Sequence, residues 1–123
     1  MPLSERVYLE HIRAACLDVA RDGQDLSMEQ LASSDPRRNS VMFSLIVIGE
    51  AVNQLSSALT SRHPLIPWRR VVDLRNLVAH RYFALDPHLL WETIHEHVPV
   101  LLTEVEIMLA EMTEGEVPDG PAA

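Results

Sequence analysis

The stretch RNLVAHRY, residues 75–82, gathers side chains that could carry out chemistry within one short segment. Arg75 can hold a phosphate and stabilise the negative charge that develops on its oxygens. His80 can take or give a proton near neutral pH, as general acid–base catalysis requires. Such a pair suits phosphoryl transfer on RNA, where the ribose 2′-hydroxyl already supplies the nucleophile. The segment is therefore compatible with a catalytic pair, Arg75 and His80, that would need neither a metal ion nor another cofactor, although the spacing alone favours a solvated or ion-paired helix face.

The spacing of the two residues restricts how a site could form. Residues five apart on an α-helix are rotated by about 140° around its axis, so Arg75 and His80 would not share a face of a regular helix. Either the helix ends or distorts near His80, or a two-fold dimer brings both copies around one cleft, where two histidines could divide the base and acid roles. Asn76 could orient the phosphate or the imidazole. The alternative is an ordinary ion pair of Arg75 with Asp73 or Glu50.

The net charge of −8 argues against nucleic-acid binding, but the charges are unevenly distributed. Residues 37–82 carry seven arginines against two acidic residues, a net of +5, whereas residues 1–36 and 83–123 are acidic. Arginine suits bidentate contact with phosphate, so the basic segment could bind RNA. Arg37 and Arg38 have two interpretations, a solvated first helical turn or an extension of the phosphate-binding track.

The other polar residues do not indicate a metal centre. The single cysteine, Cys16, excludes an internal disulfide and a multi-cysteine zinc site. His88, His95 and His97 lie near one another in the sequence, but they lack a clear pattern of supporting ligands, so we interpret them as solvent-facing. The N-terminus has no apolar segment typical of a secretory signal, and no apolar run is long enough to span a bilayer. We therefore expect a cytoplasmic protein without a membrane partner.

Apolar residues recur at helical spacing in every long segment, and no strand pattern competes. We expect an all-α, up-and-down bundle of four main helices plus a short one, in a single domain over residues 1–112. Residues 113–123 are acidic and contain several prolines and glycines, which favours a disordered tail. Pro99 lies inside the last helix and should kink or split it. The expected helices cover residues 4–23, 36–59, 67–80 and 87–109, with the short one beginning after Ser27.

The segment of residues 48–101 resembles the HepT type of HEPN-domain protein. The resemblance rests on four motifs, GEA at 49–51, PLIPW at 64–68, RNLVAHRY at 75–82 and the segment from WETI to VP at 91–99. It covers somewhat under half of the chain, and the helical layout of the remainder also fits.

The resemblance implies an all-helical homodimer that acts as a metal-independent ribonuclease toxin, with its site in the dimer cleft. The family's catalytic residues fall on Arg75 and His80, Asn76 matches the polar residue after the arginine, and Arg81 is assigned an auxiliary phosphate contact. It also implies a partner, an MntA-type nucleotidyltransferase antitoxin, which silences the toxin by adding AMP to the motif tyrosine, here Tyr82.

Two functions from different classes are compatible with these residues. The first is the toxin ribonuclease acting on RNA. The second is a non-catalytic helical dimer that binds a nucleotidyltransferase or a nucleotide. The intact arginine, histidine and tyrosine of the motif favour the first, and a ribonuclease assay of the pure, unmodified protein separates the two.

Overall fold

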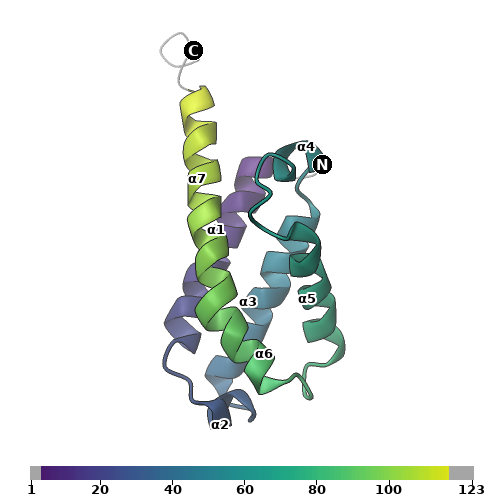
Figure 1. The fold of residues 1–123 in the computed structure, drawn as a ribbon. Coiled ribbons are helices and arrows are strands. Elements are labelled where there is room, and N and C mark those ends of the chain that lie inside the picture. The colour runs from purple at the N-terminus through teal and green to yellow at the C-terminus, as the bar shows by residue number, and fades with distance from the viewer. Residues whose placement is uncertain (1–3, 117–123) are drawn as a thin grey trace.

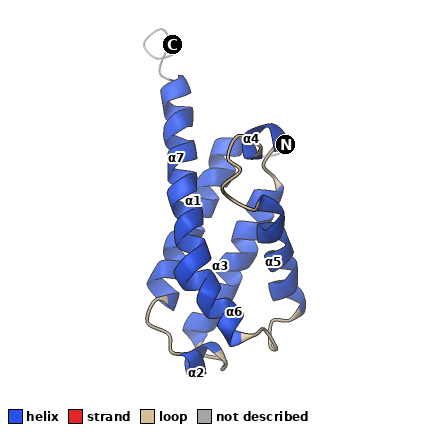
Figure 2. Cartoon of the chain, in the orientation of Figure 1, coloured by secondary structure: helices blue, strands red, loops and turns tan. Residues whose placement is uncertain are grey.

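The computed structural model describes residues 4–116, with side chains to residue 113, and all regular elements in this range are helices (Figure 2). The predicted all-α bundle is therefore confirmed. Four long helical segments run up and down alongside one another, and the two short helices lie at the ends of the bundle (Figure 1). The elements are α1 (Glu5–Gly23), α2 (Met28–Leu31), α3 (Pro36–Asn53), α4 (Ser57–Thr60), α5 (Trp68–His80), α6 (Pro87–Glu92), η1 (Thr93–His97) and α7 (Val98–Glu116).

Polar residues cap the first turns of several helices. The Ser4 hydroxyl accepts a hydrogen bond from the Val7 N–H, and Ser27 forms the reciprocal capping box with Gln30. Asp35 and Asp86 each cap a helix whose first residue is proline, which has no N–H to satisfy. Helix α1 ends at Gly23, as its glycine indicated.

The third helix is shorter than predicted. Instead of running from residue 36 to residue 59, α3 ends at Asn53, and α4 begins at Ser57. The reason is the hydroxyl of Ser56, which caps α4 by accepting from the Leu59 N–H at 3.1 Å. The carboxylate of Glu5 also accepts a 2.6 Å hydrogen bond from the Ser56 N–H, which ties this break to the start of α1.

Pro99 is accommodated by a wider helical turn and not by a break. The five residues before α7 form the π-helical turn η1, in which the Val98 N–H bonds to the Thr93 carbonyl. Such a turn relieves the clash that a proline ring makes with the preceding turn of a regular helix. As a result α6, η1 and α7 follow one continuous path along the bundle (Figure 1).

Helix α7 continues to Glu116, so the first residues of the segment assigned to a tail, 113–116, are helical. The remainder of that assignment, residues 117–123, lies outside the described residues. Within the described part, α7 extends beyond the other long helices at the end of the bundle near α4 (Figure 1).

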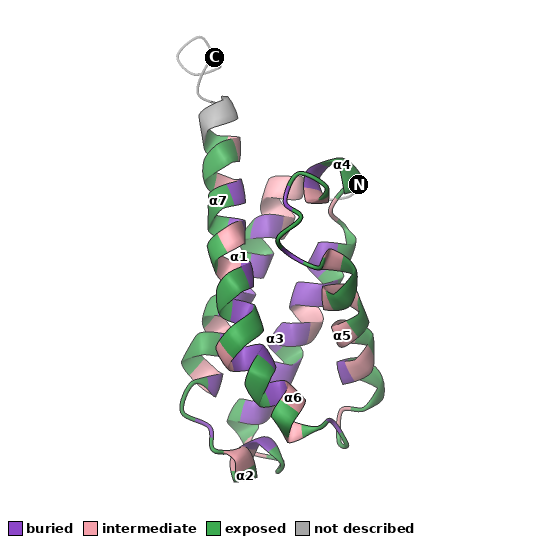
Figure 3. Cartoon of the chain, viewed as in Figure 1, coloured by how far each residue is buried: buried purple, intermediate pink, exposed green. Residues whose placement is uncertain are grey.

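The core lies between α1, α3 and α7, and Figure 3 marks the buried residues along these helices in purple. Cys16 is part of this core, and burial, with the nearby charge of Glu106, raises the pKa of its thiol to about 12. The thiol thus remains protonated and is not a candidate nucleophile. Trp68 and Met108 serve in packing, and the Trp68 indole donates to the carbonyls of Thr60 and His63.

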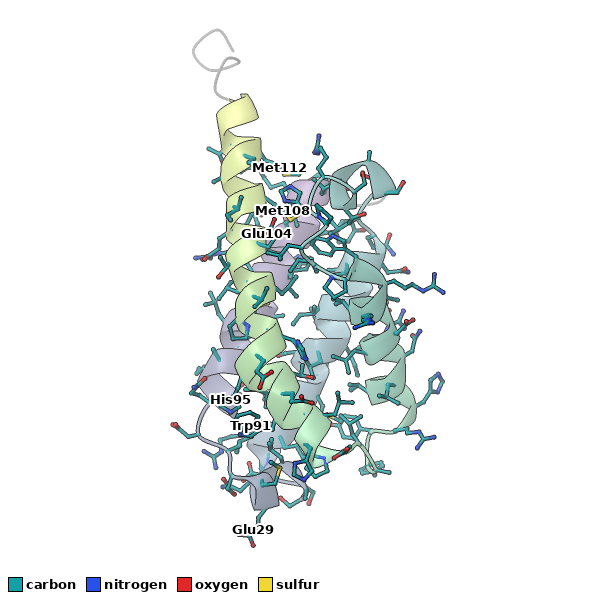
Figure 4. The ribbon with its side chains drawn as sticks, viewed as in Figure 1. Glu29, Trp91, His95, Glu104, Met108 and Met112 are labelled. Atoms are coloured by element: carbon teal, nitrogen blue, oxygen red, sulfur yellow. The ribbon has the colours of Figure 1, made fainter. Side chains whose placement is uncertain are left out.

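The loop before α5 is fastened to α7 by a buried histidine. Nδ1 of His63 lies 2.7 Å from the Glu104 carboxylate, and its Nε2 lies 3.2 Å from the Glu111 carboxylate. Figure 4 shows Glu104 on α7, on the side of this loop. The two contacts fix the start of α5, the helix that carries the motif. None of the described helices is long and apolar enough to cross a membrane.

Candidate active site

Arg75 is positioned by a close approach of α5 to α3. A Cβ atom added to Gly49 would overlap the Cβ of Arg75 and lie only 2.7 Å from its Cγ. The missing side chain of Gly49 is therefore the space in which the stem of Arg75 lies. A glycine inside an otherwise apolar helix is a sequence signal for such an approach, which the motif GEA contained.

The guanidinium of Arg75 lies beyond this contact, and not all of its N–H groups have hydrogen-bond partners. Its Nη2 lies 2.7 Å from the carboxylate of Glu50, so of the two partners that the sequence offered, Glu50 is the one it meets. Asp73 instead lies 3.7 Å from Arg69. The Nε of Arg75 is buried and has no hydrogen-bond partner among the described residues. A buried donor without a partner is costly. The Arg75 side chain as a whole is 25% exposed, so an anion can approach it there.

His80 is the last residue of α5, and its side chain is exposed. The helix is regular from Arg75 to His80 and loses helical geometry only at Arg81. Within one chain, Arg75 therefore faces α3 while His80 is rotated away by about 140°. Of the two arrangements that the spacing allowed, an end of the helix at His80 is found, and a distortion before that residue is not.

The two auxiliary residues are both on the surface. Asn76 is exposed on α5, next to Arg75 in the chain. Arg81 is also exposed, and its backbone N–H closes the helix with a 2.8 Å hydrogen bond to the Leu77 carbonyl. Within the described part of the chain, neither side chain has a hydrogen-bond or ion-pair partner, so both are free to contact a ligand.

Tyr82 is half-buried and returns toward α3. Its hydroxyl makes a long, 3.5 Å contact with the Asn39 carbonyl, and its ring lies under the guanidinium of Arg38 at 5.8 Å. The same guanidinium donates to the Tyr82 carbonyl at 2.9 Å. The weak contact of the hydroxyl means that little is lost when it turns to another partner.

Arg38 is thus an internal anchor and does not extend a phosphate track. It is only 4% exposed, and its Nε donates to the Leu31 carbonyl at 2.9 Å. Its neighbour Arg37 is exposed and pairs with Asp35, the cap of α3. The Arg37 backbone N–H, donating to that carboxylate, is the main cause that holds the pKa of Asp35 below its usual range.

The chain also has an apolar groove along α5. A hollow of about 530 Å³ lies between α5 and the segment formed by α6, η1 and α7, and Leu45 and Ile48 of α3 also line it. Leu65 and Val100 are exposed at this groove. Leu77 of the motif segment lines it, but Arg75, His80 and Tyr82 do not.

The histidines of the last long segment do not form a cluster with other ligands. His88 and His97 are exposed, and His95 lies against the ring of Trp91 with the ring centres 4.4 Å apart (Figure 4). In the part of the chain that the structure describes, no group of three or more His, Cys, Asp or Glu residues could hold a metal ion.

Comparison with known proteins places this chain among ribonucleases. The model of the family described as ribonuclease HepT-like matches residues 6–108. A provisionally named RNase of Methanocaldococcus jannaschii is 32% identical over 84% of this chain and 94% of its own length. A provisionally named RNase of Caldanaerobacter subterraneus subsp. tengcongensis is 31% identical over 85% of this chain and 93% of its own.

A third relative carries the family name. A provisionally named ribonuclease HepT of Thermococcus cleftensis is 30% identical, and the match covers 86% of this chain and 96% of the relative. No solved structure gave a significant match.

The packing at Gly49 yields a stability prediction. In Gly49→Ala the new methyl group requires α3 and α5 to move apart, and overpacking of this kind costs about 1–3 kcal/mol. Although alanine favours helix over glycine by about 1 kcal/mol, we expect a net loss of stability in urea unfolding followed by circular dichroism. Asn53→Ala, at an exposed position of the same helix, is the control and should change stability by less than about 0.5 kcal/mol. A Gly49→Ala variant as stable as the wild type would contradict the close approach.

Proposed function

This chain belongs to the HepT-like ribonuclease family, and from that membership we propose that it is a metal-independent endoribonuclease whose catalytic residues are Arg75 and His80. The observation that carries the proposal is the intact motif within the residues that the family model matches. Two features of the site support it. The Arg75 side chain is partly exposed, and His80 is exposed to an incoming substrate.

In the proposed reaction, RNA supplies its own nucleophile. A histidine takes the proton of the ribose 2′-hydroxyl, and the oxygen attacks the adjacent phosphorus. The bond from phosphorus to the 5′-oxygen breaks, and a second histidine gives that oxygen a proton. The products are a 2′,3′-cyclic phosphate and a 5′-hydroxyl. Arg75 binds the phosphate through its free donors and stabilises the charge that builds on the non-bridging oxygens.

Substitution of the two residues tests the chemistry. His80→Ala should lower the rate of RNA cleavage by about 100-fold or more, the range for loss of an acid–base catalyst. Because Arg75 packs on Gly49, Arg75→Lys is compared with Arg75→Ala. The lysine keeps a stem and a charge but not the planar fork, so both variants should lose activity. Cleavage is followed with a labelled RNA in EDTA, and the products are identified by mass spectrometry. A 5′-phosphate product, or activity that returns only on addition of a metal ion, would refute the mechanism.

The same proposal includes a two-fold homodimer, because Arg75 and His80 are rotated by about 140° from one another around α5. Helix α3 is apolar on more than one side, and such a helix is normally covered all round. One side faces the core, but Phe43, 67% exposed, and its neighbours Ile46 and Val47 line a hollow with Glu50, the partner of Arg75. A second copy on this face would place the two motifs around one cleft and cover the apolar side chains.

The assembly can be tested with a matched pair of variants. Light scattering should give twice the 13.9 kDa chain mass for the wild type and one chain mass for Phe43→Glu, which should also lose ribonuclease activity. Leu65→Glu is the control, because Leu65 is 68% exposed but lies at the apolar groove between α5 and α7. If Leu65→Glu is a monomer and Phe43→Glu is a dimer, the subunit interface lies at that groove instead. An active wild-type monomer would defeat the dimer altogether.

The proposal further assigns the chain the role of a toxin that an MntA-type nucleotidyltransferase antitoxin silences through Tyr82. The phenol oxygen would attack the α-phosphorus of ATP, and pyrophosphate would leave. The long contact of the Tyr82 hydroxyl with Asn39 leaves it available as an acceptor. The added AMP would bring a phosphate and a nucleoside next to the motif, where they would compete with RNA for the guanidinium and for space.

The chain contains two tyrosines, which gives this step an internal control. Incubation with an MntA-type enzyme and ATP should add AMP to the peptide that contains Tyr82 and stop RNA cleavage. Tyr82→Phe keeps the ring under Arg38, so it should remain an active ribonuclease but escape both modification and silencing. Tyr8→Phe should still be modified and silenced. Mass spectrometry and the cleavage assay measure both effects. If Tyr82→Phe is still modified and silenced, the acceptor lies elsewhere.

A further inference from the structure

Phe83 forms the exposed tip of the turn that follows α5. The Ala84 N–H bonds to the Arg81 carbonyl at 2.9 Å, so Tyr82 and Phe83 are the two central residues of a β-turn. The Phe83 side chain is 92% exposed, the highest value for a large apolar side chain in the described part of the chain. A lone exposed apolar residue is common on protein surfaces. The surroundings of Phe83 therefore decide whether it has a role.

The turn that carries Phe83 is held firmly on both sides. Before it, the buried guanidinium of Arg38 donates to the Tyr82 carbonyl and lies over the Tyr82 ring. The Phe83 ring in turn packs edge-on against Tyr82, with the ring centres 5.3 Å apart and the planes at 71°. After it, Leu85 is buried in the core. Phe83 is thus presented to solvent in a fixed direction, and its exposure does not come from a loose loop.

A cation without a partner lies next to Phe83. Arg81 precedes it by two residues, is exposed and has no ion-pair partner among the described residues, and the exposed imidazole of His80 is one residue further back. A flat apolar face beside a guanidinium matches a nucleotide, since the base can stack on the ring while a phosphate meets the arginine. An apolar surface of another protein would instead leave this guanidinium desolvated and unpaired.

We propose that Phe83 is a stacking platform for an unpaired RNA base beside the cleaved phosphate, and that this contact makes single-stranded RNA the substrate class. The inference rests on the proposed ribonuclease function and adds to it the form of RNA that the site accepts. In a duplex both faces of a base are already stacked, so the base cannot offer a face to Phe83 without the cost of unstacking. A loop or an unpaired end has bases whose faces are free.

The test measures binding separately from cleavage. In a His80→Ala background, which should cleave at least about 100-fold more slowly, the affinity for a fluorescent single-stranded RNA and for the same sequence as a duplex is measured by anisotropy. Adding Phe83→Ala should weaken single-strand binding by about five- to 150-fold, the effect of losing one base–aromatic stack. Binding of the duplex should hardly change. Leu65→Ala, at a similarly exposed apolar position on another face, is the control.

Two further variants separate stacking from simple apolar contact. Phe83→Leu keeps an apolar side chain without a π face, so it should bind as weakly as Phe83→Ala. Phe83→Trp should bind at least as well as the parent, and its fluorescence should be quenched by RNA after subtraction of the signal from Trp68 and Trp91. In the cleaving protein, Phe83→Ala should mainly raise KM and leave kcat nearly unchanged.

Each contrary result overturns the inference in a distinct way. If Phe83→Ala binds RNA as tightly as the parent, Phe83 is not a stacking platform, even if the protein is a ribonuclease. If the parent binds duplex and single strand equally well, the proposed preference for single-stranded RNA is wrong. If RNA binding is unchanged but AMP transfer by a nucleotidyltransferase becomes inefficient, Phe83 contacts a protein partner instead. If Phe83→Ala turns the dimer into a monomer, it belongs to the subunit interface. If RNA binding depends on Phe83 but the wild-type protein does not cleave RNA, only the proposed ribonuclease function is refuted.

Discussion

The close approach of α3 and α5 at Gly49 is the contact on which the candidate site depends. Because glycine has no Cβ, the stem of Arg75 fills the space on α3 where any other residue would place a side chain. That contact sets the rotation of α5 about its own axis. Val78, three residues further along, is consequently buried in the core, and His80 is turned to the solvent. One small residue on α3 thus determines the directions of both proposed catalytic side chains.

A second anchor fixes the other end of the motif to the same helix. Arg38, in the first turn of α3, bridges the Leu31 carbonyl and the Tyr82 carbonyl with two donors of one guanidinium. A buried arginine is tolerated because those acceptors and the Tyr82 ring satisfy it. Helix α3 therefore holds the motif at two points, Gly49 in its middle and Arg38 at its start. Arg75 and the turn after α5 are positioned before any ligand binds.

The sequence predicted the helices well where local chemistry determines them. Capping residues and helix-starting prolines act within four residues, so they can be recognised without a structure, as at Ser27 and Asp35. The break before α4 was missed because the apolar stripe continues to Leu59, and the decisive contact comes from Glu5, far away in the chain. The sequence was enough to name the motif residues but not to predict the directions in which their side chains point. Those depend on tertiary contacts of Arg75 with Gly49 and of Tyr82 with Arg38, which no periodicity encodes.

The structure also changes what the charge pattern means. Of the arginines in the basic segment 37–82, Arg38 is internal, and three others pair with acids: Arg37 with Asp35, Arg69 with Asp73 and Arg75 with Glu50. The net of +5 already counts Glu50 and Asp73, but the burial of Arg38 and the pairing of Arg37 with Asp35 make the surface less positive than that figure. The whole chain, at −8, repels a polyanion at long range. Affinity for RNA must then arise from short-range contacts at the motif. An ion pair such as Arg75–Glu50 limits non-specific attraction, since a phosphate has to compete with a carboxylate for the guanidinium. Stacking of a base on an aromatic ring does not depend on charge, so it can supply affinity for RNA that the limited electrostatic attraction does not.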